Sequence, residues 1–351
     1  MTHARTLTPL ATLLGLSLLT IGCPAESSTS KTEATLPSPA PSAEAEGELV
    51  VYCGRSEALV GPLLERFSQE SAVKVSVRYG KTPALTSQFL TEGAESPADL
   101  IFAQDSGYLG ALAGQGLLSP LPQELLDRVD PRFRGAKGHW LGTSGRARVL
   151  VYGTNSLQPS DLPAGLADLA DPKWKGKLGW APGNSSFQAH VSLLRHTWGE
   201  AKTKSWLEAM IKNEPKVYPK NSPQVAAAIS GEIQIGWVNH YYLYRKGPDA
   251  PAANYSFRTP GDEGNVLMVS GLGIRAKSPR RAAAEKLLAY LVSEGAQAHF
   301  ANEVFEYPTV PGIKVHERVP SLDSLNLATV DQSHLADVGP TLKLLQELGL
   351  Q

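Results

Sequence analysis

Two adjacent tyrosines, Tyr241 and Tyr242, carry the most specific chemistry in the sequence. They follow an apolar run, residues 233–238, that predicts a strand ending at Asn239, and loops after strands are where α/β proteins bind ligands. Adjacent phenols on such a loop can turn toward one point, whereas within a strand they would face opposite sides. A trivalent metal favours deprotonated oxygen ligands and can lower a phenol pKa far below its usual value of about 10. The pair indicates either a metal site or, alternatively, two amphipathic tyrosines at a hinge or interface.

His240 precedes the tyrosines and is a further candidate ligand. If the segment stays extended, its side chain points away from those of its neighbours. We therefore expect a structural or surface role for His240 rather than metal binding.

A second polar segment, PGNSSF at residues 182–187, comes just before a helical stretch. Asn184, Ser185 and Ser186 offer hydroxyl and backbone N–H groups at a helix start, where the helix dipole favours an anion. The same residues also suit a simple N-cap, for which Asn184 or Ser185 would suffice. Both interpretations stay open for this segment alone.

The third polar segment, SGRAR, holds two arginines beside a glycine. Arg146 and Arg148 could hold a carboxylate, carbonate or phosphate through paired N–H groups. The alternative is ordinary ion pairing at the surface.

Alternating strands and helices must position these residues. The first part of the chain predicts strands over 48–52, 73–77 and 99–102, with helices over 59–67 (N-cap Ser56) and 83–92. This order implies a parallel, doubly wound sheet, with ligands at the carboxyl ends of its strands, near residues 53–56 and 103–105.

A second set of elements follows. We predict strands over 148–152, 178–180, 233–238 and 266–274, helices over 187–195, 225–229 and 282–292, and a loop over 304–312. Ser222 and Pro223 provide a start signal for the middle helix. The segment SGR at residues 144–146 is expected to precede its strand.

The start of the chain resembles an export signal. Arg5 is followed by a mostly apolar run from Leu10 to Ile21, which is too short for a confident membrane span. Cys23 after this run suggests a lipoprotein signal over residues 1–22, although Thr20 departs from the usual pattern and an ordinary signal peptide is the alternative. Residues 23–47, rich in Ser, Pro, Ala and Glu, predict a disordered, lipid-anchored tether.

Bulk composition limits the classes of function. The chain has 351 residues and a formal net charge of -1, which suits two domains and argues against nucleic-acid binding. Acylation of Cys23 would leave Cys53 without a partner, so we expect Cys53 to be a buried residue at a strand end. The sequence has no nucleophile elbow, Walker loop, dinucleotide fingerprint or zinc-spaced Cys/His set, which weakens the case for an enzyme.

Six segments, in order and nearly without gaps, resemble the periplasmic ferric-ion-binding proteins of bacterial iron ABC transporters. They are VVYCGRSEALVGPLLERF, SPADLIFAQ, SGRARVLVY, PKWKGKLGWAPGNSSF, YPKNSPQVAAAISGEIQIGWVNHYY and EYPTVPG. The resemblance runs from about Glu48 to nearly the C-terminus.

The resemblance implies an α/β fold of two lobes (periplasmic binding protein, class II), each a mixed or parallel sheet flanked by helices and joined by crossing hinge strands. We expect one lobe over residues 48–147 with about 265–318, and the other over 148–264 with about 319–351. It further implies Fe3+ held in the interlobe cleft, delivered to ABC permease subunits in the inner membrane.

The resemblance also assigns roles to residues. Tyr241 and Tyr242 match the iron-binding tyrosines, and a synergistic anion, carbonate or phosphate, completes the metal shell. The anion contacts match Asn184, Ser185, Ser186, Asn221 and Asn239, with Arg146 near the anion or the opposing lobe.

Three positions depart from the family. A histidine and a glutamate of the first lobe are replaced by Ser56 and Gln104, and a third tyrosine is replaced by Phe187. The remaining shell would then come from the anion, water, or substitutes such as Asp105, Glu57 or a carbonate held by Arg55. Arg55, Ser56 and Gln104 are therefore possible first-lobe contacts.

The leading prediction is a periplasmic, monomeric, lipid-anchored solute-binding protein that captures Fe3+ and has no enzymatic activity. The departures keep open the same fold carrying another solute, such as a polyamine, a thiamine-like compound, sulfate or phosphonate. An exported enzyme using Arg146, Asp105 or His240 is a third possibility.

Overall fold

The computed structural model describes residues 47–350. The predicted signal peptide, Cys23, and the predicted tether apart from Gly47 lie outside these residues.

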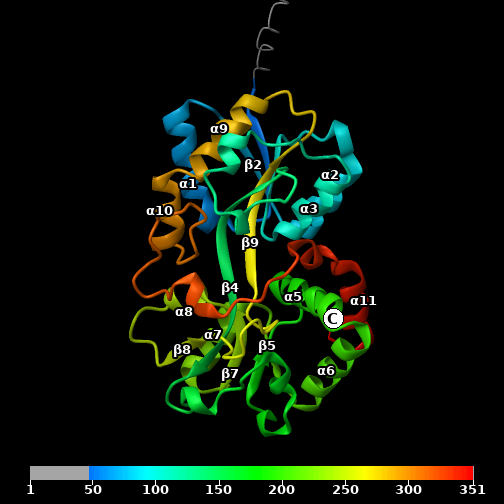
Figure 1. The fold of residues 1–351 in the computed structure, drawn as a ribbon, viewed down its shortest axis with the longest axis vertical. Helices are drawn as coiled ribbons and strands as arrows, with labels where there is room; N and C mark the ends of the chain where they lie inside the picture. The colour runs from blue at the N-terminus through cyan, green and yellow to red at the C-terminus, as the bar shows by residue number, and fades with distance from the viewer. Residues whose placement is uncertain (1–46, 351) are drawn as a thin grey trace, which may run out of the picture. The chain divides into compact units, whose positions relative to one another are not determined.

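The described chain forms a mixed α/β structure (Figure 1). The strands are β1 Leu49–Cys53, β2 Val75–Tyr79, β3 Leu100–Ala103, β4 Leu141–Gly153, β5 Leu178–Trp180, β6 Lys216–Val217, β7 Ile235–Asn239, β8 Ala252–Tyr255 and β9 Leu267–Ile274. The α-helices are α1 Glu57–Ser71, α2 Thr82–Glu92, α3 Ser106–Gly114, α4 Gln123–Leu126, α5 Ser185–Thr197, α6 Glu200–Lys212, α7 Asn221–Ser230, α8 Tyr241–Tyr244, α9 Arg281–Leu291, α10 Glu294–Asn302 and α11 Val338–Glu347. Short 3-10 helices are η1 Gly93–Glu95, η2 Pro131–Phe133, η3 Pro159–Asp161, η4 Leu166–Ala170, η5 Pro172–Trp174, η6 Leu322–Leu325 and η7 Gln332–Ala336.

The sheet confirms the predicted parallel start and then becomes mixed. Its strand order is β2-β1-β3-β9-β4-β7-β5-β6, with β8 paired to β4. β1 runs parallel to β2 and to β3, as strands linked by crossover helices must. β9 then pairs with β3 in the antiparallel sense, so the doubly wound part ends there.

Strand β4 changes partners along its length. Residues 141–147 pair with β9, and residues 148–152 pair with β7. The sequence predicted a strand only over 148–152, with SGR at residues 144–146 as its lead-in, and that boundary is wrong. These residues lack apolar alternation, and their extended conformation depends on pairing with β9, more than a hundred residues later in the chain.

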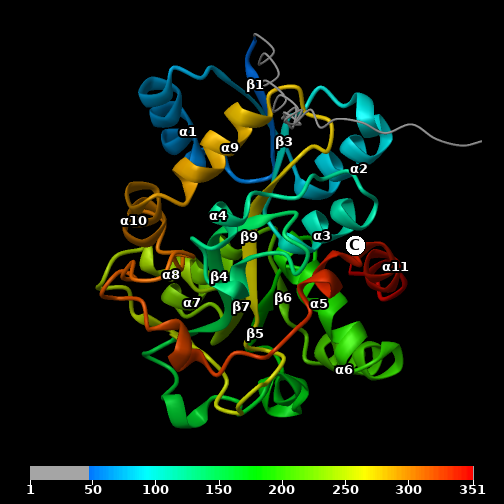
Figure 2. The ribbon, with the colours of Figure 1, turned by 45° about the horizontal axis from the view of Figure 1, so that its top comes forward.

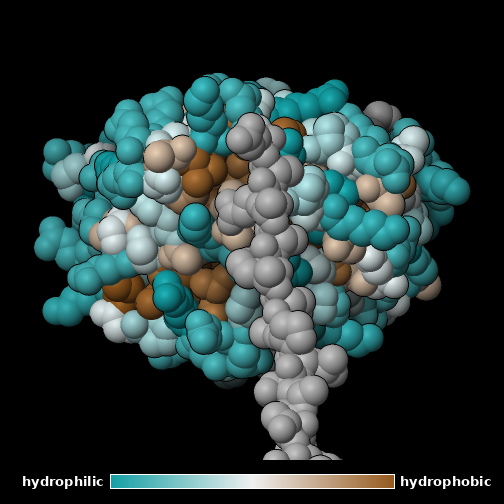
Figure 3. Space-filling model, turned by 90° about the horizontal axis from the view of Figure 1, so that it is seen from above, coloured by the Kyte–Doolittle hydropathy of each residue, from teal (hydrophilic) through white to brown (hydrophobic). Residues whose placement is uncertain are grey.

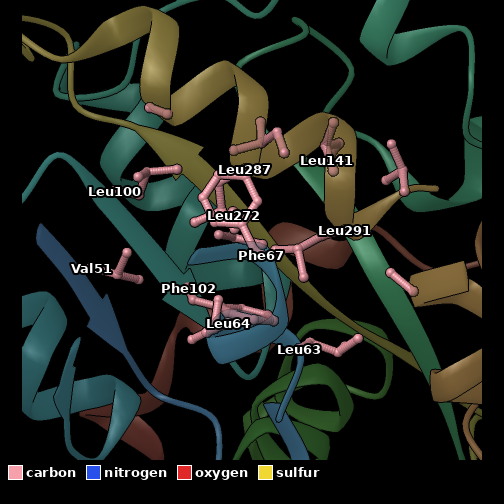
Figure 4. Packing of buried hydrophobic residues seen from close by; sticks show 14 of the residues in the cluster. Val51, Leu63, Leu64, Phe67, Leu100, Phe102, Leu141, Leu272, Leu287 and Leu291 are labelled. Carbon is pink, nitrogen blue, oxygen red and sulfur yellow. The ribbon is translucent and has the colours of Figure 1, made fainter. Parts of the chain in front are cut away.

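Two groups of apolar side chains lie on different parts of this sheet. Val51, Phe67, Phe102 and Leu287 belong to a cluster between α1, α9 and the β1–β3–β9 strands (Figure 4). A second cluster gathers aromatic residues of β5, β7, α5 and α6, together with Leu345 of α11. Figures 1 and 2 show α1, α2, α3, α9 and α10 around one end of β4 and β9, and α5, α6, α7 and α8 around the other.

Several helix boundaries differ from the predictions. Ser56 is the N-cap of α1, but its side chain makes no capping hydrogen bond. The helix predicted over 225–229 begins earlier, at Asn221, so Ser222 and Pro223 lie inside its first turn. Helices α3, α4, α6, α8, α10 and α11 were missed. The predicted loop over 304–312 contains no helix or strand, and Cys53 is buried at the end of β1, as expected.

One face of the described residues is mainly polar. Seen from the end where α9 and α2 lie, hydrophilic residues surround small hydrophobic patches (Figure 3). No helix within residues 47–350 combines the length and the apolar character needed to cross a bilayer.

Candidate metal and anion site

The tyrosine pair lies at the carboxyl end of β7, as predicted, but on a helix. His240 is the N-cap of α8, and Tyr241 and Tyr242 begin its first turn. Their rings stack with centroids 4.2 Å apart and an interplanar angle of 27°. Both phenols lie close enough to Arg148 to interact with it electrostatically. The expectation of a loop at this position is wrong, because the chain turns into a short helix directly after β7.

Burial keeps the buried tyrosine neutral in the absence of a metal. It raises the pKa of the Tyr241 phenol well above its usual value, and Tyr242 and Glu306 add to this effect. Arg55 and Arg146 act in the opposite direction. A cation that binds the phenol oxygen supplies the charge needed to release the proton.

Three buried arginines interact with the tyrosine pair, and we call Arg55, Arg146 and Arg148 the arginine cluster. Each is at most 3% exposed, so the alternative of surface pairing is wrong for Arg146 and Arg148. Arg146 Nη2 donates to Asp105 Oδ1 at 2.6 Å, and Arg55 Nη2 donates to both carboxylate oxygens of Glu306 at 2.8 Å. The three cations thus have two carboxylate partners, which leaves one excess positive charge among these five groups.

The arginine cluster also has unused hydrogen-bond donors. Arg55 Nε, Arg146 Nε and Nη1, and Arg148 Nε are buried and have no hydrogen-bond partner among the described residues. Burial lowers the pKa of Arg148 to about 9, which still leaves it charged at neutral pH. Buried donors and excess charge are costly unless paired, and an anion would satisfy both.

A chain of hydrogen bonds connects the arginine cluster to the start of α5. Arg148 Nη1 donates to Asn239 Oδ1 at 3.0 Å, and Asn239 Nδ2 donates to Ser186 Oγ at 3.2 Å. Because a guanidinium can only donate, it fixes the orientation of the Asn239 amide. Ser186 Oγ is therefore an acceptor in this chain, and its own hydrogen remains available to another acceptor.

The remaining predicted anion contacts occupy two helix starts. Asn184 is the N-cap of α5, and its Oδ1 accepts a hydrogen bond from the Ser186 N–H at 3.0 Å, so the N-cap interpretation is correct for Asn184. Asn221 begins α7, and its buried Nδ2 has no hydrogen-bond partner among residues 47–350. Helix starts favour anions, and Asn221 adds an unused donor.

The first-lobe candidates separate into two groups. Gln104 Nε2 donates to Ser185 Oγ at 3.3 Å, which brings the end of β3 to the start of α5. Ser56 and Glu57 are exposed on the first turn of α1, and the described residues provide no contact between them and the tyrosine pair. Asp105 is buried and paired with Arg146, while its Oδ2 has no hydrogen-bond partner in the described chain.

Phe187 and His240, the two remaining residues discussed from the sequence, both lie among aromatic side chains. Phe187 is buried, with ring centroids 5.6 Å from Trp180 and 5.1 Å from Trp237, which makes it part of the aromatic core. His240 is buried, its Nδ1 accepts from the Ala147 N–H at 3.1 Å, and its ring stacks on that of Tyr307. The structural role of His240 is confirmed, and the surface alternative is wrong.

Glu306 is the important residue that we did not single out. It is buried, bonded to Arg55, and accepts a hydrogen bond from Ser144 Oγ at 2.5 Å. Phe305 before it has a φ of 63°, a left-handed conformation that is unusual for a bulky residue. The only available signal was the EYPTVPG segment of the resemblance, because local sequence does not indicate that this loop is buried.

Comparisons with known proteins identify the family of the chain. Residues 95–332 match the family described as bacterial extracellular solute-binding protein. The Fe(3+)-binding periplasmic protein of Serratia marcescens is 30% identical over 316 residues, covering 89% of this chain and 93% of that protein. Iron uptake protein A1 of Synechocystis is 31% identical over 327 residues, covering 88% of this chain and 90% of that protein.

Solved structures share the fold. Iron-bound HitA from Pseudomonas aeruginosa has a TM-score of 0.79 at 29% identity, covering 86% of this chain and 99% of that protein. The fold is therefore the α/β fold of periplasmic binding proteins, and the prediction of a binding protein rather than an enzyme is confirmed. The chain belongs to the bacterial extracellular solute-binding proteins, in the family that includes these periplasmic ferric-iron-binding proteins.

Proposed function

We propose that the protein binds Fe3+ together with an oxyanion, as part of a bacterial iron-uptake system. The observation that carries this proposal is the stacked Tyr241–Tyr242 pair beside the buried arginine cluster. Two phenolates are hard, anionic oxygen ligands that suit a trivalent cation. The relatives from Serratia marcescens, Synechocystis and Pseudomonas aeruginosa are named for iron binding or iron uptake, which supports Fe3+ as the ligand of this protein.

Charge balance supports a doubly charged anion. A ferric ion with two phenolates carries one positive charge, and the arginine cluster with its two carboxylates contributes another. Carbonate or hydrogen phosphate would bring the formal charge of the buried site to zero, which low-dielectric surroundings favour. We assign the anion to the unused donors of Arg146 and Asn221 and to the Ser186 hydroxyl, with Asn184 capping the helix start beside Ser185 and Asn239 orienting Ser186.

We further propose two lobes that close over the metal. One comprises residues 48–147 with about 265–318, and the other comprises 148–264 with about 319–351. The change of β4 partners between Ala147 and Arg148 supports this boundary, as does the packing of Leu345 in the second cluster. β4 and β9 would then be the crossing hinge strands, and closure around the ligand would be the mechanism.

Transport follows from this mechanism. The closed, loaded protein would act as a monomer and deliver its metal to the ABC permease in the inner membrane. Acylation of Cys23 would keep it at a membrane facing the periplasm. Mass spectrometry of Cys23 in the membrane fraction tests the anchor, and a signal peptide cleaved beyond Cys23 would contradict it.

Visible absorption spectroscopy tests the proposal that the protein binds iron. The full chain, mixed with a ferric salt and carbonate or phosphate, should develop a visible tyrosinate-to-iron band. Tyr241→Phe combined with Tyr242→Phe should abolish that band. Tyr244→Phe, on the same short helix, is the matched control and should leave it intact, whereas absence of colour with every anion would overturn the proposal.

The substitutions at Ser56, Gln104 and Phe187 support one alternative, in which the same fold carries another solute. A polyamine, a thiamine-like compound, sulfate or phosphonate would then occupy the site. A thermal-shift screen separates the two: stabilisation by one of these solutes without stabilisation by Fe3+ would favour the alternative.

A further inference from the structure

A side-chain contact joins two edges of the candidate site. Gln104 Nε2 donates to Ser185 Oγ at 3.3 Å, although the residues are 81 positions apart in the sequence. Gln104 directly follows β3, whose Ala103 packs in a cluster with Tyr108 and Leu109. Ser185 starts α5, which packs in the separate aromatic cluster described above. The contact therefore links segments that pack in two different apolar clusters, to both of which α11 also contributes.

The backbone of Gln104 is held on both sides. Its N–H donates to Thr82 Oγ1 at 3.0 Å, and its carbonyl oxygen accepts a hydrogen bond from Arg146 Nη2. Thr82 and Arg146 are both buried, so the surrounding side chains restrict the movement of both partners. These two hydrogen bonds fix the backbone of Gln104 independently of its side-chain contact with Ser185.

The chemistry of the contact suits closure better than metal binding. Gln104 Nε2 donates to the Ser185 hydroxyl oxygen and has no lone pair for a cation, while its neutral Oε1 is a weaker ligand for Fe3+ than a phenolate or a carboxylate. Both side chains are half-buried, which leaves the contact at the edge of the site rather than within the arginine cluster. Separating the two edges would break the bond and return both groups to water.

We propose that Gln104 and Ser185 form a latch that holds the protein closed over its bound metal. The proposal rests on the proposed iron-binding function. In this role Gln104 is a positioning residue: it slows release of the metal without coordinating it. The latch would compensate for the missing first-lobe ligands by a direct contact between the two sides.

The test measures metal release from the full chain. The ferric protein with carbonate is mixed with excess EDTA, and the decay of the visible band gives the release rate. Gln104→Met keeps the side-chain length and removes the donor, so release should become about two- to tenfold faster, the range that one neutral hydrogen bond supplies. Gln115→Met, an exposed glutamine at the far end of α3, is the control and should not change the rate.

A double-mutant cycle isolates the contact. In a Ser185→Ala background, Gln104→Met should produce no further acceleration, since the bond is already absent. Thermal unfolding of each metal-free variant checks that folding is intact. An unchanged release rate, or equal acceleration in both backgrounds, would overturn the latch.

The wavelength of the visible band distinguishes a positioning role of Gln104 from metal coordination by Gln104. It should be the same in Gln104→Met and the unmutated chain, because the tyrosine ligands are untouched. A shifted band would make Gln104 a metal ligand and overturn the latch. Absence of a band in the unmutated chain would instead contradict iron binding itself.

Discussion

Arg55 and Glu306 form a fully buried ion pair between residues 251 positions apart in the sequence. Both carboxylate oxygens accept from one guanidinium nitrogen at 2.8 Å, and Ser144 Oγ adds a third hydrogen bond. Arg55, Arg146 and these hydrogen bonds lower the pKa of Glu306 against the opposing effect of burial, so this carboxylate is ionised at neutral pH. The pair ties the turn after β1 to the buried 304–312 loop and to β4.

Replacing one partner of the Arg55–Glu306 pair should destabilise the protein more than replacing both partners. Glu306→Gln leaves the Arg55 charge buried without a counter-ion, and we expect a loss of about 3 kcal/mol in the free energy of unfolding. The double variant Arg55→Met with Glu306→Gln should lose less than Glu306→Gln alone. Urea unfolding measures both, and a double variant less stable than the single one would contradict the explanation.

Metal binding should release a proton from Tyr241. Burial raises the pKa of Tyr241 well above its usual value, so its phenol is protonated until the metal arrives. We expect Tyr241→Phe to reduce the number of protons released per bound Fe3+ by about one. Titration with a pH electrode in weakly buffered solution measures this number, with Tyr244→Phe as control; equal release by both variants would exclude Tyr241 as a ligand.

His190 should make stability depend on pH. Burial lowers its pKa to about 3, with Arg148 contributing, so the folded protein holds a neutral imidazole that the unfolded chain protonates near pH 6.5. Stability from this residue is present above about pH 6.5 and is lost as the pH falls toward 3.

The change between pH 7 and pH 4.5 attributable to His190 should be about 2–3 kcal/mol, at roughly 1.4 kcal/mol per pH unit below 6.5. His190→Gln keeps a donor for the Glu263 carbonyl but cannot titrate, so its free energy of unfolding should fall less over this range. Chemical denaturation at both pH values gives the comparison. Equal losses in the two proteins would show that His190 does not contribute.

The Asn239 amide should determine the concentration of carbonate or phosphate that the site requires to bind Fe3+. Asn239→Leu leaves Arg148 Nη1 and Ser186 Oγ without this partner, and it removes the constraint that orients the Ser186 hydroxyl. We expect about tenfold more carbonate or phosphate to be needed for half-maximal colour. Asn302→Leu, an exposed substitution on α10, should not change this concentration.

Local sequence patterns predicted most of the elements that hold the site. Apolar spacing indicated the strand before Asn239 and the helix after Asn184, because such patterns report which face of a nearby segment is buried. The tyrosine pair could also be located at a strand end in this way. Its helical conformation was not predicted, since four residues are too few to show a period.

Long-range contacts decided the rest. The sequence by itself determined which polar residues lie at strand and helix ends, because those positions follow from patterns of neighbouring residues. Only the tertiary structure paired Arg55 with Glu306, extended β4 through Ser144 and Arg146, and brought Gln104 to Ser185. These contacts join segments from 81 to 251 positions apart, or depend on pairing with β9, and the free energy that stabilises them exists only once the chain has folded.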